Sequence, residues 1–587
     1  MASSNGSAGT LTQMLRMADD QALVDLLLNR PDLAFPPPTG LSDIASRATT
    51  RHSVAAAVDC LNAFELDMAR RACGFPQGFA PEDLAATLGE GSSASPDDTA
   101  STDDIAAAVA RLRKLALVWG GDGRLRPVRA LVPVLWPGAA DTGGVPTVLG
   151  PAPAPHPPTF PDAPRQFSGL VDKVAAGSAF EFVRRVDVLL EHCAVQPVRL
   201  RRDGVVASRQ IREVGRLLDV PAAVATQHLQ IAEAAGLLGV AATGSYEVLV
   251  PSADFEPWQD RSLAAQWATL AQAWRDNSAA SGPAWLKQLS LTAFGDPRDG
   301  RALPVEAVRT WLAWQRPRHG TLIDRKTTSA LNQATELGLL GLGAVASYAP
   351  FLDVAGLETH LPPRSDEVLL QADLTAVAPG PLAAAAAREL GAIADIESRG
   401  GATVYRFSST TLLRGAEQGW HPDAILAMLS ARSRTPVPQP LVYLIRDLAR
   451  ANTPTEPRPE RVVRVHGVAR ISAPDESAET RLDRAAAGAT VATLRTTEDA
   501  GASDELLPAR APGQMERSPV DTLREAVETG EAVWISSADD EGRAIERTIT
   551  AHSVDSGCLR GVEHRSDAPV DVPVRRITGA HILRRAT

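Results

Sequence analysis

The sequence predicts a multidomain, helix-rich α+β protein. The chain has 587 residues, which is more than one hydrophobic core accommodates, so about three to five domains are expected. Amphipathic helical segments that run into short extended segments recur along its first two-thirds. Segments rich in proline, glycine or acidic residues interrupt this pattern and indicate where one domain ends and the next begins.

These interruptions divide the chain into predicted domains and connecting segments. The domains are an N-terminal helical region with a winged helix (1–135), a second winged helix (165–255), a helical region with a third winged-helix-like unit (256–360), an α/β module (361–450) and a C-terminal β-barrel (520–587). The connecting segments are a Pro/Gly-rich linker (136–164) and a linker with a small α/β segment (451–519).

Composition limits the classes of protein to consider. The net charge is −11, and a negative overall field repels nucleic acid, so any DNA contact must come from local basic patches. Four lysines accompany 55 arginines, a bias that favours a GC-rich, actinobacterial source. The start, MASSNGSAGTLTQ, lacks the basic and apolar regions of a secretory leader, and no run approaches a membrane span. We therefore expect a cytoplasmic protein with no membrane contact.

The sequence lacks the motifs that mark common catalytic and metal-binding sites. The four cysteines form no C-x-x-C pair and lie near no histidine cluster with zinc spacing. None of the lysines follows the glycine loop of a P-loop, which needs G-x-x-x-x-G-K-[ST] to hold the nucleotide phosphates. Nucleophile-elbow and zinc-protease motifs are also missing. We expect no catalytic residue, metal or cofactor, and therefore no enzyme.

A weak internal repeat predicts the winged-helix units. The three copies are Val109–Val128, Leu229–Leu249 and Leu331–Phe351. Each is an amphipathic helix that ends near Leu-Ala-Leu or Gly-Leu-Leu, and the first two continue into a hairpin with glycine at its turn. A recognition helix followed by a two-stranded hairpin is the closing part of a winged helix. Upstream of the second copy, Ser208–Leu238 predicts a helix, a turn at 219–221 and a second helix.

Basic and polar residues of the first two units are the candidate DNA contacts. In DNA-binding winged helices, exposed polar residues of the recognition helix face the base edges. The candidates of this kind are Thr226, Gln227 and Gln230, and the basic candidates are Arg111, Arg113, Lys114, Arg124, Arg126, Arg199, Arg201, Arg202, Arg209 and Arg212. The alternative is that the arginines are solvated helix faces or pair with nearby acids. Winged helices also serve as protein-binding modules.

The segment 361–450 predicts a compact α/β module. Val368–Val377 predicts a strand, Pro379-Gly380-Pro381 ends it, and an alanine-rich helix follows over 382–390. A hairpin with its turn at Gly400-Gly401 comes next, and three helices close the module. Ser408 or Ser409 is the predicted N-cap of the first of these helices. The predicted order is β-α-β-β-α-α-α.

This module resembles the helicase-associated domain at the N-terminus of XPB-type helicases. The residues that carry the resemblance are VLLQADLTAVAPGPL, YRFS, GWHPDAILAML and SRTPVPQPLVYLIRD. The whole chain resembles actinobacterial helicase-associated-domain proteins that lack a motor. The resemblance implies an XPB-like helicase as partner. The partner-binding candidates are Gln371, Asp373, Tyr405, Arg406 and Trp420.

The C-terminal segment resembles the WYL domain, a small Sm-like β-barrel. The matching residues are EAVWIS, GRAIERTI, LRGVEHR and RRITGAHIL, whereas the triplet that gives the domain its name is replaced by Trp534-Ile535-Ser536. The resemblance implies a ligand site whose candidate residues are Arg547, Arg560 and Arg575. A purely structural or docking barrel is the alternative.

Two functions therefore remain open. The first is a non-catalytic accessory protein of a helicase in DNA repair, with weak, non-specific DNA contacts. The second is a winged-helix transcriptional regulator whose WYL-like tail senses a ligand. The regulator hypothesis predicts base-reading residues on a basic recognition helix, whereas the accessory hypothesis predicts a tight protein partner.

Overall fold

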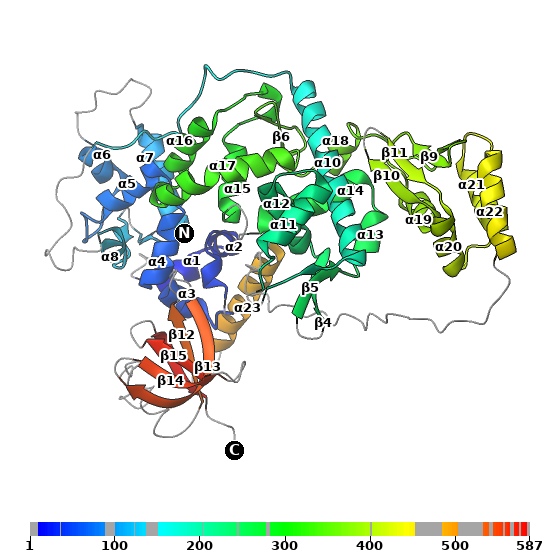
Figure 1. The fold of residues 1–587 in the computed structure, drawn as a ribbon. Coiled ribbons are helices and arrows are strands. Elements are labelled where there is room, and N and C mark those ends of the chain that lie inside the picture. The colour runs from blue at the N-terminus through cyan, green and yellow to red at the C-terminus, as the bar shows by residue number, and fades with distance from the viewer. Residues whose placement is uncertain are drawn as a thin grey trace. The chain divides into compact units, whose positions relative to one another are not determined.

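The computed structural model describes most of the chain, in two compact units that span Met1–Asp499 and Ala500–Thr587 (Figure 1). The described residues are 10–35, 37–88, 100–121, 124–136, 151–201, 204–243, 246–277, 282–399, 402–451, 484–502, 532–538, 544–555, 558–563, 569–573 and 577–583. Helices dominate the first unit, and each of its sheets is small. The predicted helix-rich α+β fold is therefore confirmed.

The N-terminal region of the first unit is a set of short helices and one small hairpin. Its elements are α1 (Leu11–Met17), α2 (Asp20–Asn29), η1 (Pro31–Leu33), α3 (Leu41–Ala48), α4 (Arg51–Asp59), α5 (Ala63–Ala72), α6 (Pro81–Thr87), α7 (Thr102–Lys114), β1 (Val118–Trp119), β2 (Arg126–Pro127) and α8 (Leu131–Leu135). Several helices begin at a residue whose side chain accepts a hydrogen bond from an amide of the first turn. The side chain thereby supplies an acceptor that this amide lacks within the helix. These N-caps are Thr10, Asp19, Thr50, Asn62 and Ser101.

The buried guanidinium of Arg30 joins the ends of these helices. It donates to the carbonyl oxygen of Ala48 at 3.3 Å and to that of Leu115 at 3.0 Å, which lie at the ends of α3 and α7. It also donates to the hydroxyl of Ser53 in α4 and lies 3.5 Å from the carboxylate of Asp32. A buried charge is tolerated only when it is paired and hydrogen-bonded, and here the partners come from separate segments.

The middle region contains the largest core of the chain. Its elements are α10 (Ser168–Val195), β3 (Val198–Arg199), α11 (Ser208–Leu218), α12 (Ala222–Ala234), β4 (Leu238–Thr243), β5 (Tyr246–Pro251), α13 (Phe255–Gln259), α14 (Leu263–Asp276), α15 (Ala284–Thr292), η3 (Pro297–Asp299), α16 (Val305–Gln315), η4 (Pro317–His319), α17 (Gly320–Glu336), β6 (Leu340–Gly341), β7 (Ala344–Val345) and α18 (Val354–Glu358). Strands β3, β5 and β4 form one antiparallel sheet in that order.

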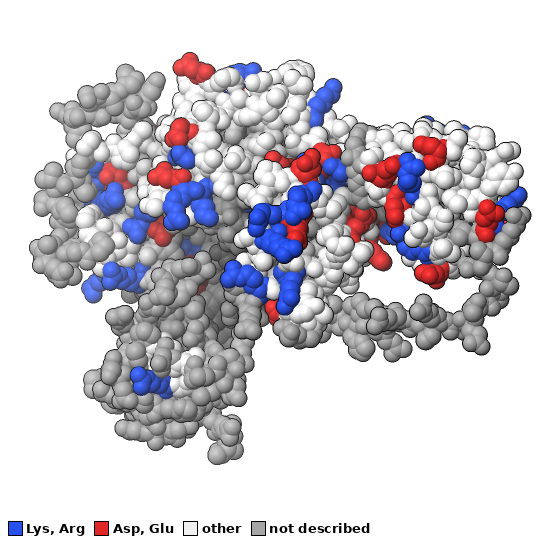
Figure 2. Space-filling model, viewed as in Figure 1, with Lys and Arg blue, Asp and Glu red and all other residues white. Residues whose placement is uncertain are grey.

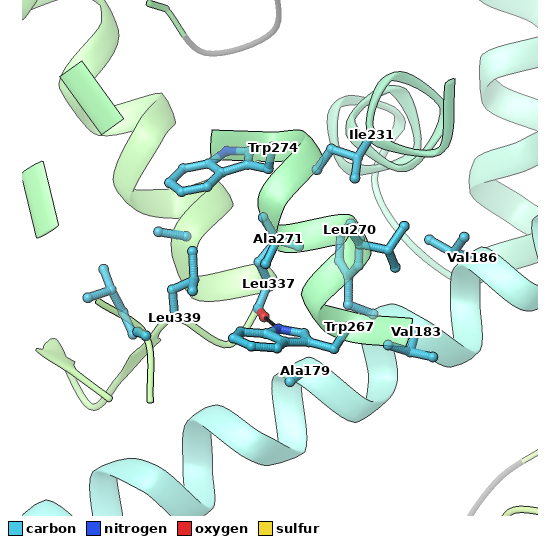
Figure 3. Packing of buried hydrophobic residues seen from close by; sticks show 14 of the residues in the cluster. Ala179, Val183, Val186, Ile231, Trp267, Leu270, Ala271, Trp274, Leu337 and Leu339 are labelled. Carbon is cyan, nitrogen blue, oxygen red and sulfur yellow. Dashed lines mark hydrogen bonds between the residues drawn. The ribbon is translucent and has the colours of Figure 1, made fainter. Parts of the chain in front are cut away.

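Buried tryptophans of α14 lie at the centre of this core. Trp267 and Trp274 are buried between α10, α12 and the end of α17, together with aliphatic side chains of those helices (Figure 3). The indole nitrogen of Trp267 donates to the carbonyl oxygen of Leu337 at 2.6 Å (Figure 3). The indole nitrogen of Trp274 donates to the side-chain oxygen of Gln333 at 2.9 Å. Both polar ends of these large apolar rings are thus satisfied inside the core.

The predicted internal repeat is confirmed by three helix ends with the same backbone geometry. Helices α7, α12 and α17 are each followed by a residue in the left-handed region, namely Ala116 (φ 52°), Gly236 (φ 73°) and Gly338 (φ 72°). The next amide then bonds to the carbonyl five residues earlier, as in a Schellman motif. These bonds run from Leu117 to Leu112 (3.0 Å), from Leu237 to Ala232 (2.9 Å) and from Leu339 to Ala334 (2.8 Å).

The hairpins that follow these helix ends close at the same position but differ in length. The carbonyl oxygens of the three leucines each accept a hydrogen bond from the far end of the hairpin. The closing bonds are Val128 to Leu117 (2.9 Å), Ser252 to Leu237 (2.9 Å) and Ala346 to Leu339 (3.0 Å). The second copy therefore carries the longest hairpin, β4–β5, and the third copy carries the shortest, β6–β7.

The α/β module has one more turn than predicted. Its elements are β8 (Leu369–Gln371), β9 (Thr375–Ala378), α19 (Ala384–Ile393), β10 (Asp395–Arg399), β11 (Thr403–Arg406), α20 (Ser409–Glu417), α21 (Pro422–Arg432) and α22 (Gln439–Ala451), and its sheet has the order β10-β11-β9-β8. The prediction of a single strand over Val368–Val377 is wrong, because the chain reverses at Leu374 (φ 67°). The predicted N-cap Ser408 is confirmed, since its side chain accepts from the amide of Thr411.

Helix α23 (Arg484–Ala502) lies inside the segment that we predicted as a linker with a small α/β element. Its side chains Ala487, Val491 and Leu494 are buried in a cluster with residues of α1, α2 and α3. A helix from late in the sequence thus packs on the first helices of the chain.

The second unit is a five-stranded antiparallel sheet. Its strands are β12 (Ala532–Ala538), β13 (Ala544–Asp555), β14 (Cys558–Glu563), β15 (Pro569–Pro573) and β16 (Ile577–Leu583), in the order β15-β14-β13-β12-β16. In the described part of this unit, no ladder joins the two edge strands β15 and β16, so the predicted Sm-like barrel is not closed there.

Candidate nucleic-acid interface and helicase-related module

The helix–turn–helix formed by α11 and α12 presents the candidate nucleic-acid interface. Asp219 ends α11 in the left-handed region (φ 52°), and Pro221 is the N-cap of α12. Gly215 lets α11 approach this turn, because a Cβ atom there would lie 2.9 Å from the carbonyl oxygen of Val220. The turn therefore holds the start of α12 directly beside the last turns of α11.

Arginines form a stripe along the exposed face of α11. Arg209, Arg212 and Arg216 are spaced i, i+3 and i+7, so they lie on one face of the helix, over about 10 Å of its axis. All three are exposed, and Figure 2 shows basic side chains gathered over α11 near the centre of the view. Arg209 pairs with Glu213 at 3.0 Å, yet its side chain stays 85% exposed. We call these three residues the α11 arginine stripe.

A surface groove lies between this stripe and the start of α12. Its volume is about 550 Å³, and its lining residues are Arg212, Gly215, Arg216, Asp219, Val220, Pro221 and Ala222. Guanidinium groups on one wall and the amide end of a helix on the other both favour an anion. The groove can thus accept a phosphate group, although Asp219 adds one opposing charge.

The exposed surface of α12 offers little for reading bases. Gln227, which we expected to be exposed on this helix, is buried, and its amide nitrogen donates to the carbonyl oxygen of Gln333 at 3.3 Å. The hydroxyl of Thr226 donates to the carbonyl oxygen of Ala222 in its own helix at 2.9 Å. Gln230 is half-buried. The expectation for Gln227 is wrong because α12 turns that face towards α17 and the core.

Strand β3, which pairs with β5, and the residues after it add further arginines. Arg199 is exposed and stacks over the ring of Tyr246 at 4.0 Å to its centroid, and such stacking leaves the guanidinium edge available to a phosphate. Arg201 is also exposed, whereas Arg202 falls outside the described residues. The structure thus brings Arg199 and Arg201 to the same sheet region of the second copy.

The basic candidates for DNA contact in the first copy differ in how exposed they are. Arg111 is half-buried and donates to the side-chain oxygen of Asn29 at 2.6 Å, so it serves packing between α7 and α2. Arg113 and Lys114 are exposed at the end of α7. Arg124 and Arg126 are exposed at the β1–β2 hairpin, where Arg126 lies 5.9 Å from the ring centroid of Trp119.

The buried His228 makes the second copy sensitive to acid. It stacks on Phe182 at 4.2 Å, its Nδ1 lies 2.7 Å from the carbonyl oxygen of Val224, and burial lowers its pKa to about 4. In the unfolded chain the imidazole of His228 binds a proton below about pH 6.5, whereas in the folded chain it does so only near pH 4. The free energy of unfolding therefore falls as the pH drops through this interval. We expect a loss of about 2–3 kcal/mol between pH 7 and pH 4.5 from this residue alone.

The check is urea unfolding at both pH values, followed by the fluorescence of the tryptophans in the same core. His228→Leu removes this part of the pH dependence, whereas the control His52→Gln, at an exposed histidine, keeps it. An equal pH dependence in His228→Leu and the unaltered chain would contradict the assignment.

The polar residues at the start of the α/β module stabilise a turn. The hydroxyl of Thr375 donates to Asp373 at 2.6 Å and lies 3.2 Å from the side-chain oxygen of Gln371. Arg406 donates to the carbonyl oxygen of Asp373 at 3.1 Å and pairs with Glu397 at 2.8 Å. Gln371, Asp373 and Arg406 remain exposed, so the structure brings these candidates together at one end of the sheet.

The aromatic candidates of the module lie in or at its core. Tyr405 is buried among the apolar residues that hold the sheet against α19, α20 and α22, so its expected place on a partner surface is wrong for this conformation. Trp420 is half-buried at the edge of the same cluster. In contrast, Tyr443 of α22 is 63% exposed, although no sequence pattern singled it out.

Two of the three ligand candidates in the second unit lie on its described strands. Arg547 lies in β13, and Arg560 is exposed in β14. Arg575 falls outside the described residues.

Groups able to act as nucleophiles or metal ligands are scattered in the part of the chain that the structure describes. No three His, Cys, Asp or Glu side chains there approach one another as a metal site requires. Burial raises the thiol pKa of Cys73 and of Cys193 to about 12, so neither is reactive at neutral pH. Among the described helices, none is both long and apolar enough to cross a membrane.

The fold and surface define a helix-rich α+β protein of repeated helix–hairpin units joined to a small mixed α/β module. Residues 368–496 match the family described as the helicase conserved C-terminal domain. The match covers the strands and helices from β8 to α22 together with most of α23. It links the chain to helicase-related proteins. No curated protein matches the chain.

Proposed function

We propose that the chain is a non-catalytic accessory protein of an XPB-like helicase. The observation that carries the proposal is the helicase-family match over 368–496 in a chain whose lysines never follow a P-loop glycine run. In P-loop enzymes that lysine reaches the β- and γ-phosphates of the nucleotide, so a sequence that lacks the motif supports a chain without a P-loop motor of its own. In this proposal ATP is used by the partner, and this chain supplies contacts to it.

The partner contact is assigned to the exposed end of the module sheet. Gln371, Asp373 and Arg406 meet there around one turn, and the hydrogen bonds of Thr375 and Glu397 hold the turn in place. A preorganised polar surface of this kind loses little conformational freedom on binding.

The nucleic-acid contact is assigned to the second predicted winged-helix unit (165–255), which we propose is a winged helix. Its basic groups lie on α11 and on the sheet, whereas the base-reading positions of α12 are buried, half-buried or bonded to their own helix. Phosphate contacts position a protein on nucleic acid without reading sequence. This distribution supports weak, non-specific binding over the alternative of a transcriptional regulator with a ligand-sensing tail.

Affinity purification of the full chain from native lysate tests the partner. We expect a superfamily 2 helicase to be recovered, and we expect Gln371→Arg to reduce its recovery at least fivefold. The matched control is Gln418→Arg, at another exposed glutamine of the same module. Recovery of no helicase, together with a defined operator from a DNA-selection assay, would overturn the proposal in favour of the regulator.

A further inference from the structure

The α1–α3 bundle has an apolar face that a helix from the end of the family match covers. Val491 and Leu494 are at most 2% exposed there, and Ala487 is fully buried. Their spacing of i, i+4 and i+7 places them on one face of α23. The other face, at Ala489 and Ala492, is exposed. Figure 1 shows α23 beside α2 and α3.

Arginines fasten α23 at both ends of this contact. Arg495 donates to the carboxylate of Asp20 at 2.9 Å, to the carbonyl oxygen of Arg16 at 3.1 Å and to that of Ala18. Those carbonyl oxygens lie at the end of α1, where a helix leaves acceptors without internal partners. At the other end, Arg484 lies 3.5 Å from the carboxylate of Asp25.

The contact is small for a permanent part of a core. Only three apolar side chains of α23 are buried in the described part of the helix, and the two arginine contacts lie at the protein surface, where ion pairs contribute little. Residues 452–483 separate α23 from α22. Such a contact persists in one chain because the connection keeps the helix at a high effective concentration, and a separate helix of the same chemistry can compete with it.

We infer that the α1–α3 face is a helix-binding site and that α23 is its exchangeable resident ligand. The site takes an amphipathic helix with small apolar residues at i, i+4 and i+7 and an arginine that caps α1 and pairs with Asp20. Through α23, the helicase-related segment binds to the N-terminal helices. This inference does not depend on the proposed partner or on nucleic-acid binding.

The test uses the full chain and a fluorescent peptide of residues 484–502 as the probe. Val491→Asp in the full chain places a charge in the apolar face and releases α23, so this variant binds the peptide at least tenfold more tightly than the unaltered chain, measured by anisotropy. Ala492→Asp, on the exposed face of the same helix, behaves as the unaltered chain. A peptide with Arg495→Gln binds the released chain at least threefold more weakly.

A milder variant keeps the inference falsifiable if Val491→Asp fails to fold. Leu494→Ala loosens α23 without burying a charge, and it too gains affinity for the peptide. The inference is overturned if neither variant binds the peptide better than the unaltered chain. It is equally overturned if both variants unfold the N-terminal helices, because α23 would then be a fixed part of that core.

Discussion

We expect the joint replacement of Arg209, Arg212 and Arg216 by glutamine to lower the affinity for nucleic acid by on the order of a hundredfold at 50 mM salt, because the α11 stripe supplies most of the phosphate contacts in the proposed interface. With about four contacts, the unaltered chain loses about 150-fold in affinity between 50 and 200 mM salt, and the variant loses only about fourfold. Fluorescence anisotropy with a labelled duplex of arbitrary sequence measures both quantities.

The control for this prediction carries the same change of net charge elsewhere. Arg298, Arg325 and Arg388 are exposed outside the second copy, and their joint replacement by glutamine leaves the salt dependence nearly unchanged. A duplex of different sequence gives the same affinities within about threefold, since phosphate contacts do not distinguish bases. A salt slope near zero in the unaltered chain would remove nucleic acid from the proposed function.

Gly338→Ala destabilises the middle region by about 3 kcal/mol or more. A Cβ atom there would lie 2.3 Å from the carbonyl oxygen of Ala175 and 2.6 Å from the amide nitrogen of Ala179, both in α10. These are backbone atoms, so α10 and the end of α17 must separate. The left-handed conformation of residue 338 adds a further cost of about 1 kcal/mol. Urea unfolding followed by tryptophan fluorescence reports the change, because Trp267 bonds to Leu337.

Gly236 provides the matched comparison at the equivalent helix end. It has nearly the same φ, 73° against 72°, but a Cβ atom there meets nothing within 4 Å. Gly236→Ala therefore costs only the conformational part, about 1 kcal/mol. Equal effects of the two substitutions would show that the close approach of α10 to residue 338 carries no energy.

The repeat was predictable because neighbouring residues in the sequence determine it. A leucine pair after an amphipathic helix, with glycine before it, is the pattern of a helix that ends in the left-handed region and continues into a strand. Two copies obey it with Gly236 and Gly338, whereas the first places Ala116 in that region. The fold class, the two helices around Asp219 and the Ser408 cap follow from the same kind of short-range signal.

Most of the features that the sequence did not predict depend on partners distant in the chain. The apolar run from Val368 continues through a turn, which local hydrogen bonds of Thr375 and a bond to Asp373 from Arg406, 33 residues later, stabilise. Gln227 looks like a surface residue until Gln333 of α17 is placed beside it. Helix α23 lies in a segment flanked by polar residues, and the sequence does not show that its apolar face packs on α1–α3.

The short β6–β7 hairpin brings the third copy into close backbone contact with α10. Gly341 lies against α10, since a Cβ atom there would be 2.4 Å from the carbonyl oxygen of Val171, so the third copy is locked to α10 by backbone contacts at both Gly338 and Gly341. Helix α10 spans about 42 Å and also packs on α11 and α12. Because α11 and the third copy both pack on α10, they can move relative to each other only by breaking contacts with α10.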